Sequence, residues 1–443
     1  MKKNKNAFTL IELLAVIVIL AVILVISIPR ILDVIDESKL DSIKSSARMI
    51  INSAEKKNMI DKVNGSTEEV TCDNSVKLSK EDYESCKITI DEEGKATINL
   101  VGKGKFDGYK CIGTNDNLAC GQVESITLPL NGKEYIEKLY SNELSRIENG
   151  LKKDNTEDQN IRYYGSNPNN YVRFNNELWR IIGVFGNNVK LVRSESLGNL
   201  SWDSSELSVN YGWGVNEWGE STYEDGTSYP GSDLMQYLNK MYYGGDTTIT
   251  CFNSLNNTET ICPKDSNDKF LTIDETSKVL IDNHTWNIGA VESSKKTDTL
   301  EFYKRERGTN VKTCTSGSIC NDNVIRTTIW TGYVALPYVT DWAYASSESI
   351  CETNMQAQDD SNNYICKNNN WINNRSTWTW YLTPSIGSVG ADRAWDILYN
   401  GSFGDTSTRF NFSVYPSIYL KNNVIIESGT GTSDNPYILK AGS

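Results

Sequence analysis

Residues 7–29 read AFTLIELLAVIVILAVILVISIP, and this stretch decides how the rest of the chain is interpreted. Residues 8–28 form an apolar run in which Glu12 is the only charge. Sixteen of these residues are Phe, Leu, Ile or Val. Each favours the centre of a bilayer by roughly 0.3–0.6 kcal/mol, against a cost of about 3 kcal/mol for one buried acid. A helix of this length is about 31 Å long and matches the hydrocarbon thickness. We therefore predict a transmembrane helix over residues 8–28.

The residues on either side of the apolar run predict its orientation and processing. Residues 1–6 contain three lysines and no acid, which places the N-terminus in the cytoplasm and everything after Pro29 outside. In a secretory signal peptide the small residue of the cleavage site follows the apolar run. Here the small residue, Ala7, precedes the run. Cleavage at Ala7 would therefore leave the hydrophobic helix on the mature protein.

This order of features resembles the class III signal of type IV prepilins and pseudopilins, whose motif is a small residue followed by F-T-L-x-E. The resemblance covers residues 1–60. It implies that a prepilin peptidase removes residues 1–7 by cutting between Ala7 and Phe8, and that the new amine of Phe8 is N-methylated. Glu12 then becomes the fifth mature residue and Pro29 the twenty-second, as in type IV pilins. Ala7 is a departure, because the family usually has Gly at that position.

The resemblance also implies roles for the two remaining motif residues. Glu12 is expected to pair with the Phe8 ammonium of a neighbouring subunit and to set the axial register, since an acid inside a membrane segment is a functional candidate. Pro29 is expected to bend the helix, because proline removes one helical hydrogen bond. The partners implied are other pilin subunits, first in the cell membrane and then in an extracellular surface filament.

Composition and charge limit the other partners. The formal net charge of the 443-residue chain is −13, and removal of three leader lysines makes it −16. An acidic surface keeps an extracellular domain soluble and argues against a nucleic-acid partner, which requires a basic surface.

Ten cysteines all follow the apolar run, and their even number in an outward-facing chain predicts disulfides. Nearest-neighbour pairing closes five short loops, each worth roughly 2–3 kcal/mol in the chain-entropy model. The sequence does not fix that connectivity. There is no CxxC spacing and only one histidine, so we expect no structural metal site. The disulfide candidates are Cys72, Cys86, Cys111, Cys120, Cys251, Cys262, Cys314, Cys320, Cys351 and Cys366.

The expected fold class is α+β, with a long N-terminal transmembrane and amphipathic helix over residues 8–63. Apolar residues between Arg30 and Val63 recur at three- and four-residue spacing, which continues the helix beyond the membrane. Residues 64–122 are expected to form a small antiparallel pilin-like head. Its hairpin joins Lys87–Asp91 to Ala96–Val101 through a turn at 92–95. Residues 123–160 then supply a short helix and a charged linker.

Residues 161–443 are expected to form a larger, strand-rich α+β domain. All eleven tryptophans and the only histidine lie beyond residue 170. Alternating apolar residues predict strands over Tyr171–Phe174, Glu177–Phe185 and Val189–Arg193. Ser232 and Asp233 are typical of a helix start.

This region also resembles a domain of unknown function from surface proteins of low-GC Gram-positive and mollicute-like bacteria. Its layout is similar to C-type-lectin-like and formylglycine-generating-enzyme-like folds, which host many functions. The stretches that carry the resemblance are NYVRFNNELWRIIGVF, SDLMQYLNKMYY, ALPYVTDWAYAS, WTWYLTP and VYPSIYLKNNVIIESGTGTSDNPYIL.

No catalytic arrangement is recognisable, and we expect no enzyme activity and no cofactor. His284 stands alone, and no Ser/His/Asp set, P-loop or GxGxxG after a strand is present. Loops 265–268 and 359–362 are rich in Asp and Asn and could hold calcium, although neither fits an EF-hand and solvated turns are the simpler interpretation. Trp202, Trp342 and Trp395 each adjoin an acid, an arrangement that suits sugars or protein partners but also occurs in cores.

The sequence therefore predicts a minor or tip type IV pilin-like subunit that displays a C-terminal recognition or adhesion domain for a glycan or a protein. The size of that domain favours few copies per filament. Three alternatives stay open: a pseudopilin of a type II secretion or DNA-uptake machine, a membrane-tethered surface enzyme, and a simple signal anchor.

Overall fold

The structure is a computed structural model that describes most of the chain. Of residues 12, 24–29, 32, 221, 223, 251–253, 258–260 and 324–325 only the backbone is described. The described residues are 10–66, 68–76, 78–79, 81–91, 93–123, 126–204, 215–223, 226, 228–249, 251–253, 258–260, 262–292, 295, 297–308, 324–325, 327–373, 377–386 and 392–442.

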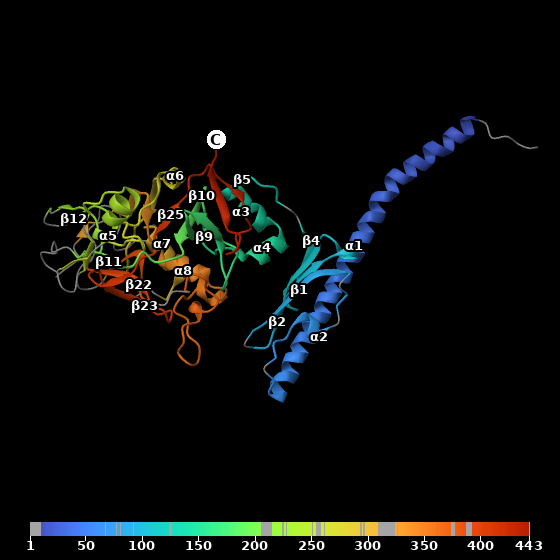
Figure 1. The fold of residues 1–443 in the computed structure, drawn as a ribbon, viewed down its shortest axis with the longest axis horizontal. Coiled ribbons are helices and arrows are strands. Elements are labelled where there is room, and N and C mark those ends of the chain that lie inside the picture. Colours follow the sequence, from blue (N-terminus) through green and yellow to red (C-terminus); the bar gives the residue numbers. More distant parts are fainter. Residues whose placement is uncertain are drawn as a thin grey trace, which may run out of the picture. The chain divides into compact units, whose positions relative to one another are not determined.

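The chain divides into two compact units (Figure 1). Unit 1 comprises residues 1–125 together with 143–147, and unit 2 comprises residues 126–142 together with 148–443. Each unit has its own hydrophobic core.

Helix α1 (Leu10–Asn64) runs through unit 1 as 55 continuous helical residues. Its second half buries one face, because residues at three- and four-residue spacing face the same side of a helix. The predicted apolar positions earlier and later on the helix are not all buried, since Ile31, Val34, Ile35 and Ile60 are exposed. The fully buried residues of α1 are Ile43, Ala47, Ile50, Ile51 and Ala54.

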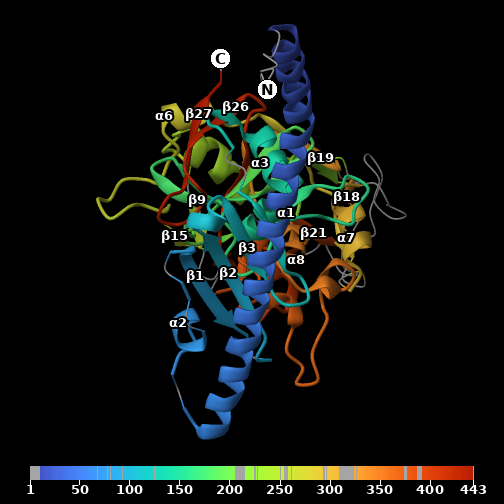
Figure 2. The ribbon, with the colours of Figure 1, turned by 90° about the vertical axis from the view of Figure 1, so that its right-hand side faces the viewer.

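A four-stranded antiparallel sheet packs on this face of α1 (Figure 2). The hairpin predicted around residues 92–95 is confirmed, with Ile88 opposite Ile98 across the first two strands. The buried residues alternate along the second strand at Ala96, Ile98 and Leu100, as expected for a sheet with one face on a core. The strands, in spatial order, are β1 (Tyr83–Ile90), β2 (Ala96–Gly102), β3 (Tyr109–Gly113) and β4 (Ala119–Gln122), accompanied by α2 (Cys72–Ser75) and η1 (Gly104–Phe106).

Three disulfides have the nearest-neighbour pairing. Cys72–Cys86 links α2 to β1, Cys111–Cys120 links β3 to β4, and Cys351–Cys366 closes a loop in unit 2. Cys262 is also disulfide-bonded. The side chain of Cys251 is not described, and Cys314 and Cys320 lie outside the described residues.

The prediction of a transmembrane helix over residues 8–28 is not borne out by the part of the chain that the structure describes. Within that part, no helix is both long enough and apolar enough to cross a membrane. Residues 8 and 9 lie outside the described range, and the side chains of residues 12 and 24–28 are not described.

The main sheet of unit 2 contains ten strands and is mixed, because β27 runs parallel to β8. The predicted meander is present at its centre as β8, β9 and β10, which pair in antiparallel fashion. The path order is β20 (Val334–Ala335), β25 (Ser417–Tyr419), β10 (Asn188–Arg193), β9 (Glu177–Phe185), β8 (Tyr171–Phe174), β27 (Tyr437–Ala441), β26 (Val424–Ser428) and β5 (Leu130–Asn131), with β6 (Leu151–Lys153) and β7 (Ile161–Tyr163) joined beside β9.

A second sheet of six strands completes the framework of unit 2. Its path runs β11 (Asn199–Ser201), β24 (Asn411–Ser413), β21 (Thr379–Ile386), β22 (Arg393–Ile397) and β23 (Phe403–Ser407), with β17 (Val291–Glu292) parallel to β21. Smaller pairings join β12 (Ser221–Tyr223) to β13 (Ser228–Tyr229) and β18 (Val324–Ile325), β14 (Cys251–Asn253) to β15 (Thr258–Thr260), and β16 (His284–Asn287) to β19 (Ile329–Gly332).

The helices of unit 2 are short. Ser232 caps α5 by accepting a hydrogen bond from the Met235 N–H, as the sequence predicted. The helices are α3 (Gly132–Ser141), α4 (Glu143–Asn149, whose first residues belong to unit 1), α5 (Asp233–Gln236) continued by η2 (Tyr237–Tyr243), α6 (Glu275–Lys278), α7 (Thr299–Glu306), α8 (Val339–Ala345), η4 (Ser349–Glu352) and η5 (Ile365–Lys367).

Candidate functional site

The predicted assembly residues all belong to the N-terminal end of the chain. Ala7 and Phe8 lie outside the described residues, so their predicted cleavage and methylation have no structural counterpart here. Glu12 and Pro29 both lie within the backbone of α1. The structure therefore places the acid and the proline of the motif on one continuous helix, 17 residues apart.

The first turns of α1 expose a large apolar surface. Leu10 and Ile11 are 84% and 78% exposed, and the large apolar side chains that follow, up to Ile23, are about half exposed. Each fully buried aliphatic side chain contributes roughly 1.5–3 kcal/mol. Large contiguous apolar patches are rare on free protein surfaces and mark interaction sites. This segment, Leu10–Ile23, is the candidate assembly surface.

A different kind of site lies inside unit 2, where four charged side chains form a buried network. The Arg162 guanidinium donates from Nε to Asp154 Oδ2 at 2.6 Å and from Nη1 to Asp341 Oδ1 at 2.8 Å. The Lys190 ammonium lies 2.6 Å from the other oxygen of Asp341, Oδ2. All four side chains are at most 1% exposed. They join β7, β10 and α8, which are far apart in sequence.

Aromatic rings enclose the lysine of this network. The Lys190 Nζ lies 4.0 Å from the ring centre of Tyr338, with Trp286, Tyr419 and Phe185 at 5.3–5.6 Å. Such cation–π contacts stabilise a desolvated cation. Burial lowers the pKa of Lys190 to about 8, although Asp341 opposes this shift. Lys190 therefore still carries its charge at neutral pH.

Asp341 is the centre of the network. Burial alone would raise the pKa of its carboxyl, but Lys190 and Arg162 hold that pKa below its ordinary value. The Tyr338 N–H also donates to Asp341 Oδ2 at 2.9 Å, which caps the start of α8. Because a buried carboxylate must be paired, Asp341 fixes α8, β7 and β10 relative to one another.

A second buried carboxylate lies beside this network. Glu306, at the end of α7, accepts hydrogen bonds from the hydroxyls of Thr340 and Thr383. Burial raises its pKa, while the neighbouring Arg307 guanidinium lowers it. Glu306 thereby ties α7 to α8 and to β21. The side chain of Glu306 is fully buried and that of Arg307 is 10% exposed, so both belong to the polar core of unit 2.

Most of the candidate binding residues that the sequence suggested in unit 2 lie in its core or at the edge of the core. The three acid–tryptophan pairs, 202–203, 341–342 and 395–396, are at most 1% exposed, so none of them can contact a ligand directly. His284 stacks on Tyr419 at 3.7 Å, and its Nδ1 lies 3.0 Å from Asp282 Oδ2. It therefore belongs to the edge of the core.

The two Asp-rich loops form turns that satisfy their own carboxylates. Asp265 accepts hydrogen bonds from the N–H groups of Asn267 and Lys269, and Asp359 accepts from those of Ser361 and Asn363. In the described part of the chain, no group of three or more His, Cys, Asp or Glu side chains could hold a metal ion.

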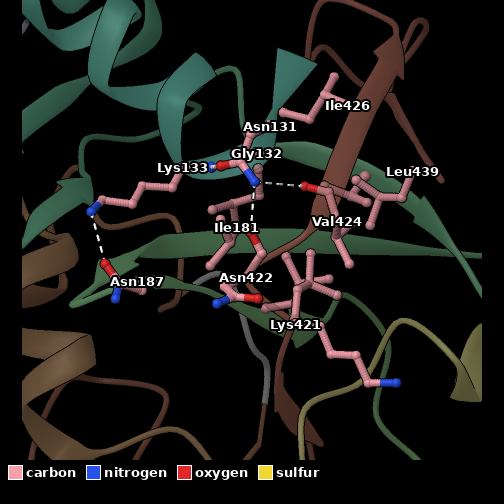
Figure 3. A pocket seen from close by; sticks show the side chains of 14 residues that line it. Asn131, Gly132, Lys133, Ile181, Asn187, Lys421, Asn422, Val424, Ile426 and Leu439 are labelled. Atoms are coloured by element: carbon pink, nitrogen blue, oxygen red, sulfur yellow. Dashed lines mark hydrogen bonds between the residues drawn. The ribbon is translucent and has the colours of Figure 1, made fainter. Parts of the chain in front are cut away.

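One hollow in unit 2 lies between α3 and the main sheet (Figure 3). The Asn131 amide spans it and donates to the carbonyl oxygens of Asn422 and Val424, while Lys133 donates to Asn187. Its volume is about 10 Å³. A single water needs at least about 10–15 Å³, so this hollow cannot hold a metabolite.

Comparisons with known proteins match only the N-terminus. Residues 2–28 match the family model described as the prokaryotic N-terminal methylation motif. This match supports a type IV pilin-like signal, with processing by a prepilin peptidase and assembly with other pilins. No curated protein and no solved structure matches the chain, so the resemblance of residues 161–443 to a surface domain has no support from these comparisons.

The importance of the buried network can be tested by substitution. We expect Asp341→Ala to lower the free energy of unfolding of unit 2 by about 3–5 kcal/mol, because it leaves Lys190 and part of Arg162 buried without a counter-charge. Denaturant unfolding followed by tryptophan fluorescence reports this, since all tryptophans belong to unit 2. Glu427→Ala breaks the exposed pair Glu427–Lys440 and should cost less than about 1 kcal/mol. Equal effects of the two substitutions would contradict the role assigned to Asp341.

Proposed function

We propose that this chain is a type IV pilin-like subunit. In this proposal α1 holds the chain in the membrane before processing, and the mature chain then assembles into a surface filament that displays unit 2 as a recognition domain. The observation that carries the proposal is the methylation motif at residues 2–28, placed at the start of a 55-residue helix.

The exposure of α1 supports assembly through this helix. The apolar side chains from Leu10 to Ile23 have no cover from described residues of this chain. Lipid would cover these side chains before assembly, and the helices of neighbouring subunits would cover them in the filament. Such cover is favourable because it removes apolar surface from water. The buried half of α1 meanwhile keeps the four-stranded sheet attached to the helix.

The size of unit 2 favours a minor or tip position. A compact unit of roughly 310 residues has a radius of gyration of about 20 Å. Closely packed helices would force such units against one another if every subunit carried one. We therefore propose that the chain is present in few copies and acts in recognition or adhesion.

The assembly role of Glu12 gives the sharpest test of this proposal. Glu12→Ala removes the carboxylate proposed to pair with the Phe8 ammonium of a neighbour, and should leave the chain in the membrane fraction while it disappears from sheared surface filaments. Immunoblots of the two fractions measure this, with a loss of at least tenfold expected in filaments. Glu427→Ala, the same substitution on the exposed surface of unit 2, should assemble normally. Normal incorporation of Glu12→Ala would contradict the proposed register role.

The copy number distinguishes a minor subunit from a major one. Immunogold labelling with an antibody to unit 2 should mark filament ends or a few isolated points, because neighbouring units of this size would collide. Dense and evenly spaced labelling along the shaft would refute the minor or tip position while leaving the pilin-like character intact.

A further inference from the structure

Asp396 is a buried acid of unit 2 that lacks the partners seen in the charged network. It is 0% exposed, and none of the described residues donates a hydrogen bond to either of its carboxyl oxygens. No described lysine or arginine forms an ion pair with it, whereas Asp154 and Asp341 are both paired with Arg162. Burying a carboxylate without a hydrogen bond or a counter-charge is strongly unfavourable. The fold therefore favours the neutral, protonated form of Asp396.

The carboxyl group of Asp396 lies against the backbone of a neighbouring strand. Asp396 is on β22, where Trp380 of β21 and Gly404 of β23 are its partners on either side (Figure 1). A β-carbon at position 404 would lie 2.7 and 2.8 Å from the two oxygens of Asp396, which is too close for any side chain. Glycine at position 404 thus leaves the space that the carboxyl group occupies.

The charged residues of the β22–β23 hairpin face the other side of the sheet. Successive residues of a strand point to opposite faces, so Arg393 on β22 and Asp405 on β23 lie on the face away from the Asp396 side chain. Arg393 donates from Nη1 to the Asp405 carbonyl oxygen at 2.6 Å, and Asp405 Oδ2 accepts from the Ser385 hydroxyl at 3.0 Å. Thr406 shares the face of Asp396 but is neutral. The hairpin therefore supplies no counter-charge on that face.

The other described elements packed on β22 supply no counter-charge either. Strand β21 contains no charged residue. Helix α8 belongs with Trp395 to the core cluster on the opposite face of β22, and its acid Asp341 is already paired. The Asn216 amide bridges β21 and β22 by donating to their carbonyl oxygens, and the next residue, Glu217, is itself an acid. Ionisation of Asp396 would therefore leave a buried charge that these elements do not neutralise.

The protonation state of this carboxyl changes near neutral pH. Burial raises the pKa of Asp396 to about 7. Thr406 and Arg393 lower this pKa, whereas Asp405 raises it further. In water an aspartic acid has a pKa of about 3.9. At pH 5 the buried group is therefore neutral, and above about pH 7 it becomes a carboxylate that is more stable in water than inside the sheet.

Displacement of β23 is the movement that would expose the carboxyl at the lowest cost in buried surface. In the described sheet β23 is the last strand and pairs only with β22. Of its five residues only Phe403 is buried, whereas four of the five residues of β22 are buried. Tyr399, in the turn that joins the two strands, is 61% exposed. Strand β22 in contrast also pairs with β21, so β23 is the more readily released of the two strands.

We propose that Asp396 makes β23 a pH-sensitive edge of unit 2: β23 stays on β22 while the carboxyl is protonated, and ionisation of that carboxyl favours its release. The switch lies in unit 2 alone and does not depend on the assembly role proposed for α1. Release returns the carboxyl to water, where its pKa is lower and the carboxylate is favoured. The equilibrium constant for opening should therefore rise about tenfold per pH unit between pH 5 and pH 7 and level off above about pH 7.

Hydrogen–deuterium exchange followed by mass spectrometry tests this proposal on the full mature chain in mild detergent. Labelling times at each pH between 5 and 8.5 are adjusted for the intrinsic exchange rate of free amides. Protection of peptides that cover β23 should fall about 100-fold between pH 5 and pH 7 and then stay constant. Peptides from β8, β9 and β10 in the main sheet should keep their protection over the same range.

Variants that cannot ionise at position 396 separate the switch from a general effect of pH. Asp396→Asn has nearly the same shape and should keep at pH 8 the protection that β23 has at pH 5. Asp396→Ala gives the same comparison if the asparagine amide is not accommodated. Glu427→Gln, which removes an exposed acid of the main sheet, is the matched control and should respond as the wild type does.

Three results would overturn the proposed switch. The first is wild-type protection of β23 that does not change between pH 5 and pH 8. The second is a loss of protection that is equal throughout unit 2, because the opening would then not be confined to β23. The third is a wild-type pH response in a folded Asp396→Asn or Asp396→Ala chain.

Discussion

The apolar surface at the start of α1 is the main constraint on how this chain can be accommodated. The large apolar side chains from Leu10 to Ile23 are about half exposed or more, although each would be more stable out of water. The second half of the same helix satisfies this requirement within the chain, since Ile43, Ile50 and Ile51 are buried under the sheet of unit 1. The first part of α1 thus exposes apolar side chains that other molecules could cover, whereas its second part packs against the sheet of unit 1. The methylation motif at residues 2–28 includes the exposed apolar segment Leu10–Ile23.

Unit 2 is organised around pairs of groups that are distant in sequence. Arg162, Lys190 and Asp341 come from two strands and a helix, and their buried charges oblige those elements to meet. The main sheet is joined in the same way, because the Asn131 amide donates to the Asn422 carbonyl across 291 residues. Replacing one charged residue of such a network lowers the free energy of unfolding, because the charge of its partner stays buried without a counter-charge.

The sequence predicted the local elements well and the distant pairings poorly. The strands β8, β9 and β10 were predictable because alternation and the turns at Asn175 and Gly186 are local signals. The pairing of β5 with β26 and of β27 with β8 was not, because no local pattern encodes which strands meet. The exposure of Ile31 and Val34 was missed for a related reason, since the periodicity of a helix does not say where its covering sheet ends.

The same difference between local patterns and distant contacts applies to the candidate sites. Roles for Ala7, Phe8, Glu12 and Pro29 could be proposed from the sequence because the methylation motif at residues 2–28 is a local pattern. The acid–tryptophan pairs suggested ligand contacts but are buried, as in the case of Asp341 and Trp342. Nothing in the sequence distinguished the exposed Trp378 from the buried Trp380, because residues two apart on a strand face the same side and only the tertiary packing decides how far each one is covered.

In the proposed function, α1 assembles only after residues 1–7 have been removed from the chain. Mass spectrometry of the N-terminal peptide, from chain isolated from the cell surface, tests this most directly. We expect a mature chain that begins at N-methylated Phe8 and lacks residues 1–7. A surface chain that still begins at Met1 would contradict it.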